Sequence, residues 1–173
     1  MRNRKVLLLA SMVAFLGILA GDPASAQSLK QQLVGTWKVS SATMQIGEQK
    51  KPVPLGTDIV GLVLYNPDGY MCFTAMSANR PIFGSGDRAG GTMEQKAAAF
   101  ESYRSTCGRY EVVSEKDRII THAFEVSLTP DLTGQTEKRF VKEISGDKLI
   151  LETIPHVLKG EKVTGVWTYQ RIK

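Results

Sequence analysis

The feature that most constrains the fold of this chain is a succession of β-rich segments separated by short turns. These segments cover residues 35–40, 59–65, 70–76, 108–113, 118–128, 135–144, 148–153 and 163–171. A parallel sheet would need helices between its strands, and only one stretch of the sequence predicts a convincing helix. The order of elements therefore predicts an all-β domain, built as an up-and-down barrel or as a sandwich.

Local signals place the turns and the helix. Residues 66–69 read Asn-Pro-Asp-Gly, in which proline presets φ and glycine accepts a positive φ, so the flanking segments are expected to form a β-hairpin. Thr92 and Gln95 have capping-box spacing, which predicts a short helix to about Tyr103. Residues 77–91 hold four glycines and a proline. That composition favours a mobile flap over one mouth of a barrel.

The first residues are typical of a secretory signal. Basic residues within 2–5 precede an apolar run over 6–20, and Ala24-Ser25-Ala26 follows with small residues at the cleavage positions. The run is shorter than the roughly 20 residues that a membrane-spanning helix needs. We expect a cleaved signal at residues 1–26 and a mature domain at 27–173. The mature protein should then be periplasmic or secreted, with no membrane anchor after cleavage.

The net charge of the mature domain is mild. Of the 22 Lys and Arg residues, three lie in the predicted signal, and of the 17 Asp and Glu residues, one does, which leaves +3. The basic residues occur singly or in pairs and form no stripe with interleaved aromatic residues. Nucleic acid is therefore not expected as a partner.

The chain has two cysteines, Cys72 and Cys107. An oxidising compartment permits a disulfide between them, and two separate thiols are equally compatible with the sequence. No ligand pair lies at zinc spacing, so no metal site is predicted, and no motif calls for a cofactor.

An ordered set of short motifs gives the chain a resemblance to the bacterial and fungal lipocalin-like domain family. The motifs run from about Leu33 to Arg171 and comprise Gly35-Thr36-Trp37, Tyr65-Asn66-Pro67-Asp68-Gly69-Tyr70-Met71, Asn79-Arg80-Pro81, Gly108-Arg109-Tyr110, His122 with Ser127-Leu128 and Pro130, Gly134 with Arg139-Phe140, and Asp147 with Leu149. This resemblance implies a lipocalin-like antiparallel up-and-down β-barrel of about eight strands with one short helix. Such a barrel has room for one small ligand.

The chain departs from the family pattern in three places. Residues 105–108 read Ser-Thr-Cys-Gly where the family has Ala-Tyr-x-Gly, and Cys72-Phe73 replace small residues. The last segment ends Tyr169-Gln170-Arg171 where the family ends Trp-x-Arg. The first two changes fall where a lumen could be lined, so a ligand common to the family would transfer poorly to this chain.

His122 and Arg139 are the polar candidates for the lumen. His122 alternates with apolar residues, including Phe124, on one face of its segment. In a simple hairpin register Arg139 pairs with Phe124 and faces inward beside His122. A buried guanidinium needs an acceptor. Glu125 and Glu137 could serve only after a shift in register, so a ligand carboxylate is the alternative partner.

Aromatic residues supply the remaining candidates. Tyr70, Tyr110, Trp167 and Tyr169 have apolar rings with polar tips, which suit the wall of a small-molecule pocket. Trp37 and Arg171 have a structural role in the resemblance: the terminal arginine lies across the indole and closes one end of the barrel.

Three function classes stay open. The first is an exported carrier or sensor that binds a small, mostly apolar molecule, with or without an acidic group, in the barrel lumen. The second is a cofactor-free isomerase or cyclase with His122 as acid or base, although no catalytic motif is present and the residues favour a binding protein. The third is a periplasmic protein-binding or inhibitor module, which would have a filled core and a protein partner.

Overall fold

The computed structural model describes residues 27–173, and the predicted signal at 1–26 lies outside the described residues. Its elements in chain order are α1 (Leu29–Leu33), β1 (Gly35–Ile46), β2 (Gln49–Pro52), β3 (Ile59–Tyr65), β4 (Tyr70–Ser77), α2 (Met93–Glu101), β5 (Tyr103–Ser114), β6 (Ile119–Ser127), the 3-10 turn η1 (Pro130–Leu132), β7 (Thr136–Ile144), β8 (Lys148–Thr153), β9 (His156–Leu158) and β10 (Glu161–Arg171).

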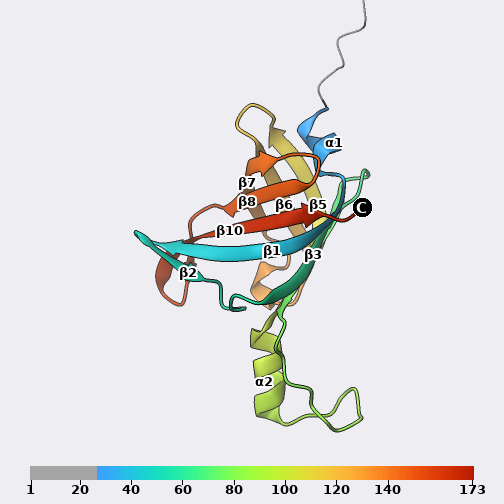
Figure 1. Cartoon of the computed structure of the whole chain (residues 1–173), viewed down its shortest axis with the longest axis vertical. Coiled ribbons are helices and arrows are strands. Elements are labelled where there is room, and N and C mark those ends of the chain that lie inside the picture. Colours follow the sequence, from blue (N-terminus) through green and yellow to red (C-terminus); the bar gives the residue numbers. More distant parts are fainter. Residues whose placement is uncertain (1–26) are drawn as a thin grey trace, which may run out of the picture.

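The strands form one antiparallel sheet that closes on itself. The order is β2-β1-β3-β4-β5-β6-β7-β8-β10-β9, and β1 also pairs with β10 from Trp37 opposite Arg171 to Ile46 opposite Val163. Eight strands therefore make a closed barrel (Figure 1). β2 pairs with the C-terminal end of β1 and β9 with the N-terminal end of β10, so both extend the sheet beyond the barrel. The predicted all-β, antiparallel barrel of about eight strands with one short helix is confirmed.

Four strands differ from the sequence prediction. β1 continues to Ile46 and turns at Gly47, which has a positive φ of 56°, into β2. β2 and β9 are short and mostly exposed, so their sequences lack the alternation that identifies a half-buried strand. β5 begins at Tyr103, five residues before the predicted start, because its first residues pair with β4.

One end of the barrel is filled by an apolar core. Trp37, Leu33 and Tyr110 are almost completely buried there, and α1 covers this end. Ser28 is the N-cap of this helix: its hydroxyl oxygen accepts a hydrogen bond from the backbone N–H of Gln31, and its own backbone N–H donates to the side-chain oxygen of Gln31. This reciprocal cap stabilises a helix too short to be stable alone.

Arg171 fastens α1 to this closed end. Its guanidinium lies 3.9 Å from the Trp37 ring. Its nitrogens donate to the backbone oxygens of Gln32 (2.6 Å), Val34 (2.7 Å) and Gly146 (2.7 Å). Gly35 has φ of 133°, and a Cβ there would lie 2.6 Å from the guanidinium. Glycine therefore suits this position of the Gly-x-Trp motif for two reasons: the backbone of Gly35 has a positive φ, and the missing side chain leaves space for the Arg171 guanidinium.

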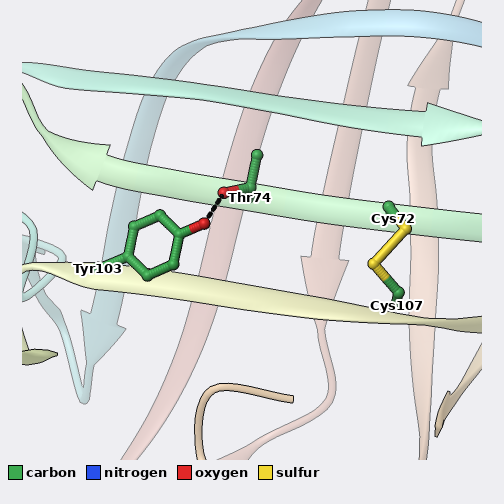
Figure 2. The surroundings of a disulfide bond; sticks show 4 residues. All are labelled: Cys72, Thr74, Tyr103 and Cys107. Carbon is green, nitrogen blue, oxygen red and sulfur yellow. Dashed lines mark hydrogen bonds between the residues drawn. A yellow bond between two sulfur atoms is a disulfide. The ribbon is translucent and has the colours of Figure 1, made fainter. Parts of the chain in front are cut away.

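Cys72 and Cys107 form a disulfide between directly opposed positions of β4 and β5 (Figure 2). Cys72 is exposed, because its neighbours Met71 and Phe73 take the inward positions of β4. The two cysteines therefore lie on the outer wall of the barrel, and of the unusual pair Cys72-Phe73 only Phe73 contributes to the lumen. The alternative that the sequence left open, two free thiols, is not what the structure has.

The helix α2 projects from the barrel on the side away from α1 (Figure 1). The predicted helix is confirmed, with the Thr92–Gln95 capping box in place, but none of its residues is buried. Arg80 holds its C-terminal end to the barrel by donating to the Ala99 carbonyl at 3.0 Å and lying over the Tyr103 ring. No helix within residues 27–173 has the length and apolar character that crossing a membrane requires.

Candidate functional site

The barrel encloses a cavity of about 540 Å³. It lies between the closed end and the end from which α2 projects, and side chains of β1, of the segment 53–55 and of β3 to β10 form its wall. Its lining consists of Met44, Val53, Pro54, Leu55, Val63, Tyr65, Phe73, Phe100, Glu101, Arg104, Ser105, Thr106, His122, Phe124, Thr129, Leu132, Glu137, Arg139, Leu151, Thr153, His156, Val157, Leu158, Val163, Gly165, Trp167 and Tyr169. This volume is in the range of small-molecule sites.

The structure brings five of the seven lumen candidates together in this wall. They are His122, Phe124, Arg139, Trp167 and Tyr169. His122 and Phe124 lie two residues apart on β6, and Trp167 and Tyr169 lie two residues apart on β10. Side chains two residues apart on a strand share a face. The alternation read from the sequence therefore placed these side chains on the inner face of the barrel.

The other two candidates, Tyr70 and Tyr110, do not line the cavity. Tyr70 lies on the outer face, where Arg109 stacks on its ring at 4.4 Å and donates to its hydroxyl at 2.8 Å. The β3–β4 loop is one residue longer than the four-residue turn, so Tyr65 pairs with Met71, and Tyr70 turns outward. Tyr110 is buried in the closed end and donates to the Asn66 carbonyl at 2.8 Å.

The partner of Arg139 is Glu137, one of the two acidic residues that the sequence allowed only after a shift in register. Arg139 lies opposite Ile120, not Phe124, because η1 and its flanking residues make the β6–β7 connection longer than a simple hairpin loop. The register moves by four residues, an even number, so Arg139 still faces inward. Its guanidinium forms an ion pair with Glu137 at 2.5 Å, two residues earlier on the same face of β7. A ligand carboxylate is thus not needed to balance this charge.

Tyr65 is a lumen residue that the sequence analysis missed. Its hydroxyl lies 3.0 Å from Nε2 of His122, and both side chains are buried. The signal that could have found it is the alternation along β3, in which Gly61, Val63 and Tyr65 take the buried positions. The hairpin motif that contains Tyr65 does not by itself show which way the side chain points.

Burial keeps one histidine and two tyrosines of the cavity neutral. It lowers the pKa of His122 well below the ordinary histidine value, and the positive charge of Arg139 lowers that pKa further. Burial also raises the pKa of Tyr65 well above its ordinary value and raises that of Tyr169. At neutral pH, His122, Tyr65 and Tyr169 therefore offer hydrogen bonds but no charge.

The mouth of the cavity is formed by α2 and by loops. Phe100, Glu101 and Arg104 line it from the C-terminal end of α2 and the start of β5. The segment 77–91, expected to act as a flap, contributes no side chain to the lining of the cavity. The segment is connected to the mouth indirectly, because Arg80 donates a hydrogen bond to the carbonyl oxygen of Ala99 in α2.

Neutral burial of His122 predicts a pH-dependent stability. The unfolded chain takes up a proton on His122 below about pH 6.5, the ordinary value, whereas the folded chain does not. The contribution of neutral His122 to the free energy of unfolding is therefore complete above about pH 6.5. It is lost as pH falls toward the lowered pKa of His122 in the folded chain, by about 1.4 kcal/mol per pH unit. Urea unfolding at about pH 7.5 and about pH 5.5 should show wild type losing about 1 kcal/mol more than a His122→Gln variant.

The matched control for this measurement is His156→Gln. His156 is the other histidine of the chain and is exposed on β9. The control should lose as much stability as wild type over the same pH interval. Equal losses in wild type and in His122→Gln would contradict the neutral burial of His122.

The chain is similar to one protein family and to two solved structures. A model of the lipocalin-like domain family matches residues 34–172. A solved lipocalin-like protein from Bacteroides uniformis is 11% identical with a TM-score of 0.41, covering 82% of this chain and 99% of that one. A redesigned β-barrel is 16% identical with a TM-score of 0.40, covering 87% of this chain and 100% of that one. No curated protein matches the sequence.

The family match spans nearly all of the residues that the structure describes. It includes the Trp37–Arg171 closure and every strand of the closed barrel. The chain therefore belongs to the lipocalin-like domain family.

Proposed function

We propose that this protein binds a small, mostly apolar molecule in the barrel lumen and that it does so after export. The observation that carries the proposal is the cavity of about 540 Å³, whose wall is largely aliphatic and aromatic. Burying apolar surface against such a wall supplies the binding free energy, at roughly 25 cal/mol per Å² before the costs of association. A few polar side chains in the same wall supply orientation.

Export is supported by the sequence of residues 1–26 and by the cysteine chemistry. The Cys72–Cys107 disulfide is suited to an oxidising compartment. The expected product is a mature chain that starts at Gln27, and N-terminal sequencing of protein recovered from the periplasm or the medium checks it. Protein that keeps residues 1–26 and is found in the cytoplasmic fraction would contradict export. It would leave the proposed binding of a ligand in the lumen unaffected.

The two other function classes have less support. An inhibitor with a filled core does not need a lumen of this size. For an isomerase or cyclase, the available acid–base pair is Tyr65 with His122, and the lowered pKa of His122 makes it a weak proton acceptor at neutral pH. The geometry favours binding over proton transfer.

Binding can be tested with a neutral, apolar fluorescent probe, N-phenylnaphthylamine. Trp167 lines the cavity, whereas Trp37 is buried in the closed end. We expect the probe to brighten on binding and to quench Trp167, so that a Trp167→Phe variant, which retains Trp37, shows little quenching. Native mass spectrometry of the purified mature protein, beside a denatured sample, should detect any molecule that the lumen has retained.

A lumen-filling variant distinguishes the cavity from the outer surface. Thr106 lines the cavity on β5, and Thr121 lies on β6 at a position that alternates with the buried residues. Thr106→Phe should weaken probe binding by about tenfold, and Thr121→Phe should leave it unchanged. Equal probe affinity in both folded variants would place the probe outside the lumen and contradict the proposal.

A further inference from the structure

Five polar side chains meet at one place in the mostly apolar wall of the cavity. We call Tyr65, His122, Glu137, Arg139 and Tyr169 the polar cluster. They come from β3, β6, β7 and β10, and all five line the cavity. Arg139 is close enough to His122, Tyr65 and Tyr169 to shift the pKa of each of them. The cluster is thus one electrostatic unit.

Some of the hydrogen-bonding capacity of this cluster is already used. The Tyr65 hydroxyl and Nε2 of His122 satisfy each other at 3.0 Å, and the Arg139 guanidinium is paired with the Glu137 carboxylate. Between the residues that the structure describes, Tyr169 makes no hydrogen bond through its hydroxyl and His122 makes none through Nδ1. Neither atom is among the buried side-chain polar atoms that lack a partner, which in the described residues is Nε of Arg80 alone. Both residues line the cavity.

The charges of the cluster cancel. Arg139 and Glu137 contribute one charge of each sign, and the buried histidine and tyrosines are neutral. At the mouth, Glu101 and Arg104 again contribute one of each. A ligand carboxylate placed against Arg139 would lie beside the Glu137 carboxylate, and it would give up its hydration without gaining an unpaired cation.

We propose that the polar cluster selects a neutral hydrogen-bonding head group, such as a hydroxyl, carbonyl or carboxamide, through the Tyr169 hydroxyl and Nδ1 of His122. The apolar remainder of the ligand lies along Phe73, Leu151 and Trp167. This inference rests on the proposed function and adds to it the chemical class of the ligand. Glu137 is the residue that excludes carboxylates, because it occupies the guanidinium that would otherwise attract them.

The experiment uses three probes with the same alkyl chain: decanol, decanamide and decanoate. Each displaces N-phenylnaphthylamine from the mature protein at neutral pH, and the displacement gives its Kd. We expect decanol and decanamide to bind about tenfold more tightly than decanoate. In Glu137→Gln, which leaves the Arg139 charge unpaired, the preference should reverse in favour of decanoate.

A second variant tests the head-group contact itself. Tyr169→Phe removes only the hydroxyl and should weaken decanol and decanamide about threefold to tenfold. Tyr70→Phe is the matched control, since Tyr70 lies on the outer face, and it should change none of the three values. Urea unfolding verifies that each variant is folded before its Kd is compared.

The outcomes separate this inference from the proposed function. Tighter binding of decanoate in wild type, equal displacement by all three probes, or equal decanol affinity in Tyr169→Phe and Tyr70→Phe would overturn the head-group assignment. Each of those results would leave lumen binding intact. Failure of N-phenylnaphthylamine to bind at all would instead count against the proposed function.

Discussion

Replacing Arg171 by methionine should lower the free energy of unfolding by about 2–4 kcal/mol, the largest effect that we expect from a single substitution outside the apolar core. The guanidinium donates to the carbonyls of Gln32, Val34 and Gly146 and lies on the Trp37 ring. Methionine keeps the apolar length but leaves three acceptors without their donor. The Val34 and Gln32 contacts are partly buried, so water replaces them incompletely, and α1 should detach first.

Urea unfolding of the mature protein measures this effect, and amide hydrogen exchange of residues 29–33 reports the detachment of α1. Arg171→Lys keeps the charge but cannot reach three carbonyls at once, so it should recover less than half of the loss. The control Arg88→Met lies on an exposed loop and should be neutral. A loss below about 0.5 kcal/mol in Arg171→Met would mean that the closure of this end does not depend on the arginine.

Removing the disulfide should lower the free energy of unfolding by about 3 kcal/mol. Cys72 and Cys107 are 35 residues apart in sequence, so the bridge restricts a loop in the unfolded chain that includes all of α2 and the segment 77–91. In the folded state the cost of losing it is small, because β4 and β5 stay paired through seven residue pairs, including Thr74 with Ser105. The effect therefore comes mainly from the unfolded chain.

The double variant Cys72→Ala/Cys107→Ala is the direct measurement, because it leaves no lone thiol. Wild type unfolded in the presence of a reductant should give the same free energy as the double variant. Binding of N-phenylnaphthylamine should be nearly unchanged, since both cysteines lie on the outer wall. Equal stability of the oxidised protein and the double variant would show that the bridge does not constrain the unfolded chain.

Much of the barrel could be read from the sequence because its signals are local. The turn at residues 66–69, the capping box at Thr92 and Gln95, and the period-two alternation around His122 each depend on neighbours within a few positions. The strands β2 and β9 escaped detection for the same reason, since both are mostly exposed and carry no alternation. Local rules find elements that have one buried face and miss those that have none.

The wall of the lumen shows where this approach stops. Arg139 faces inward as the alternation predicts, because an even shift of register preserves the face of a strand, yet its neighbour across the strand is Ile120 and not Phe124. Its acceptor is Glu137, which the sequence allowed only after a shift in register. Tyr70 was chosen for its aromatic ring and polar tip, which do not show the face of the strand. It faces outward because Tyr65 pairs with Met71, which takes the inner face in its place. Tyr65 takes the lumen position instead.

The sequence by itself determined the number of main strands, the hairpins, the helix α2 and the side of the sheet that His122, Phe124, Trp167 and Tyr169 face. Only the tertiary structure decided which strands close the barrel, that Cys72 meets Cys107, and that Arg139 is neutralised by Glu137 beside the Tyr65–His122 pair. The physical reason is the distance along the sequence over which each of these features is determined. Turn chemistry and alternation act over a few residues, whereas register, closure and the partners of buried charges depend on strands that are distant in sequence and are fixed only when the whole sheet pairs.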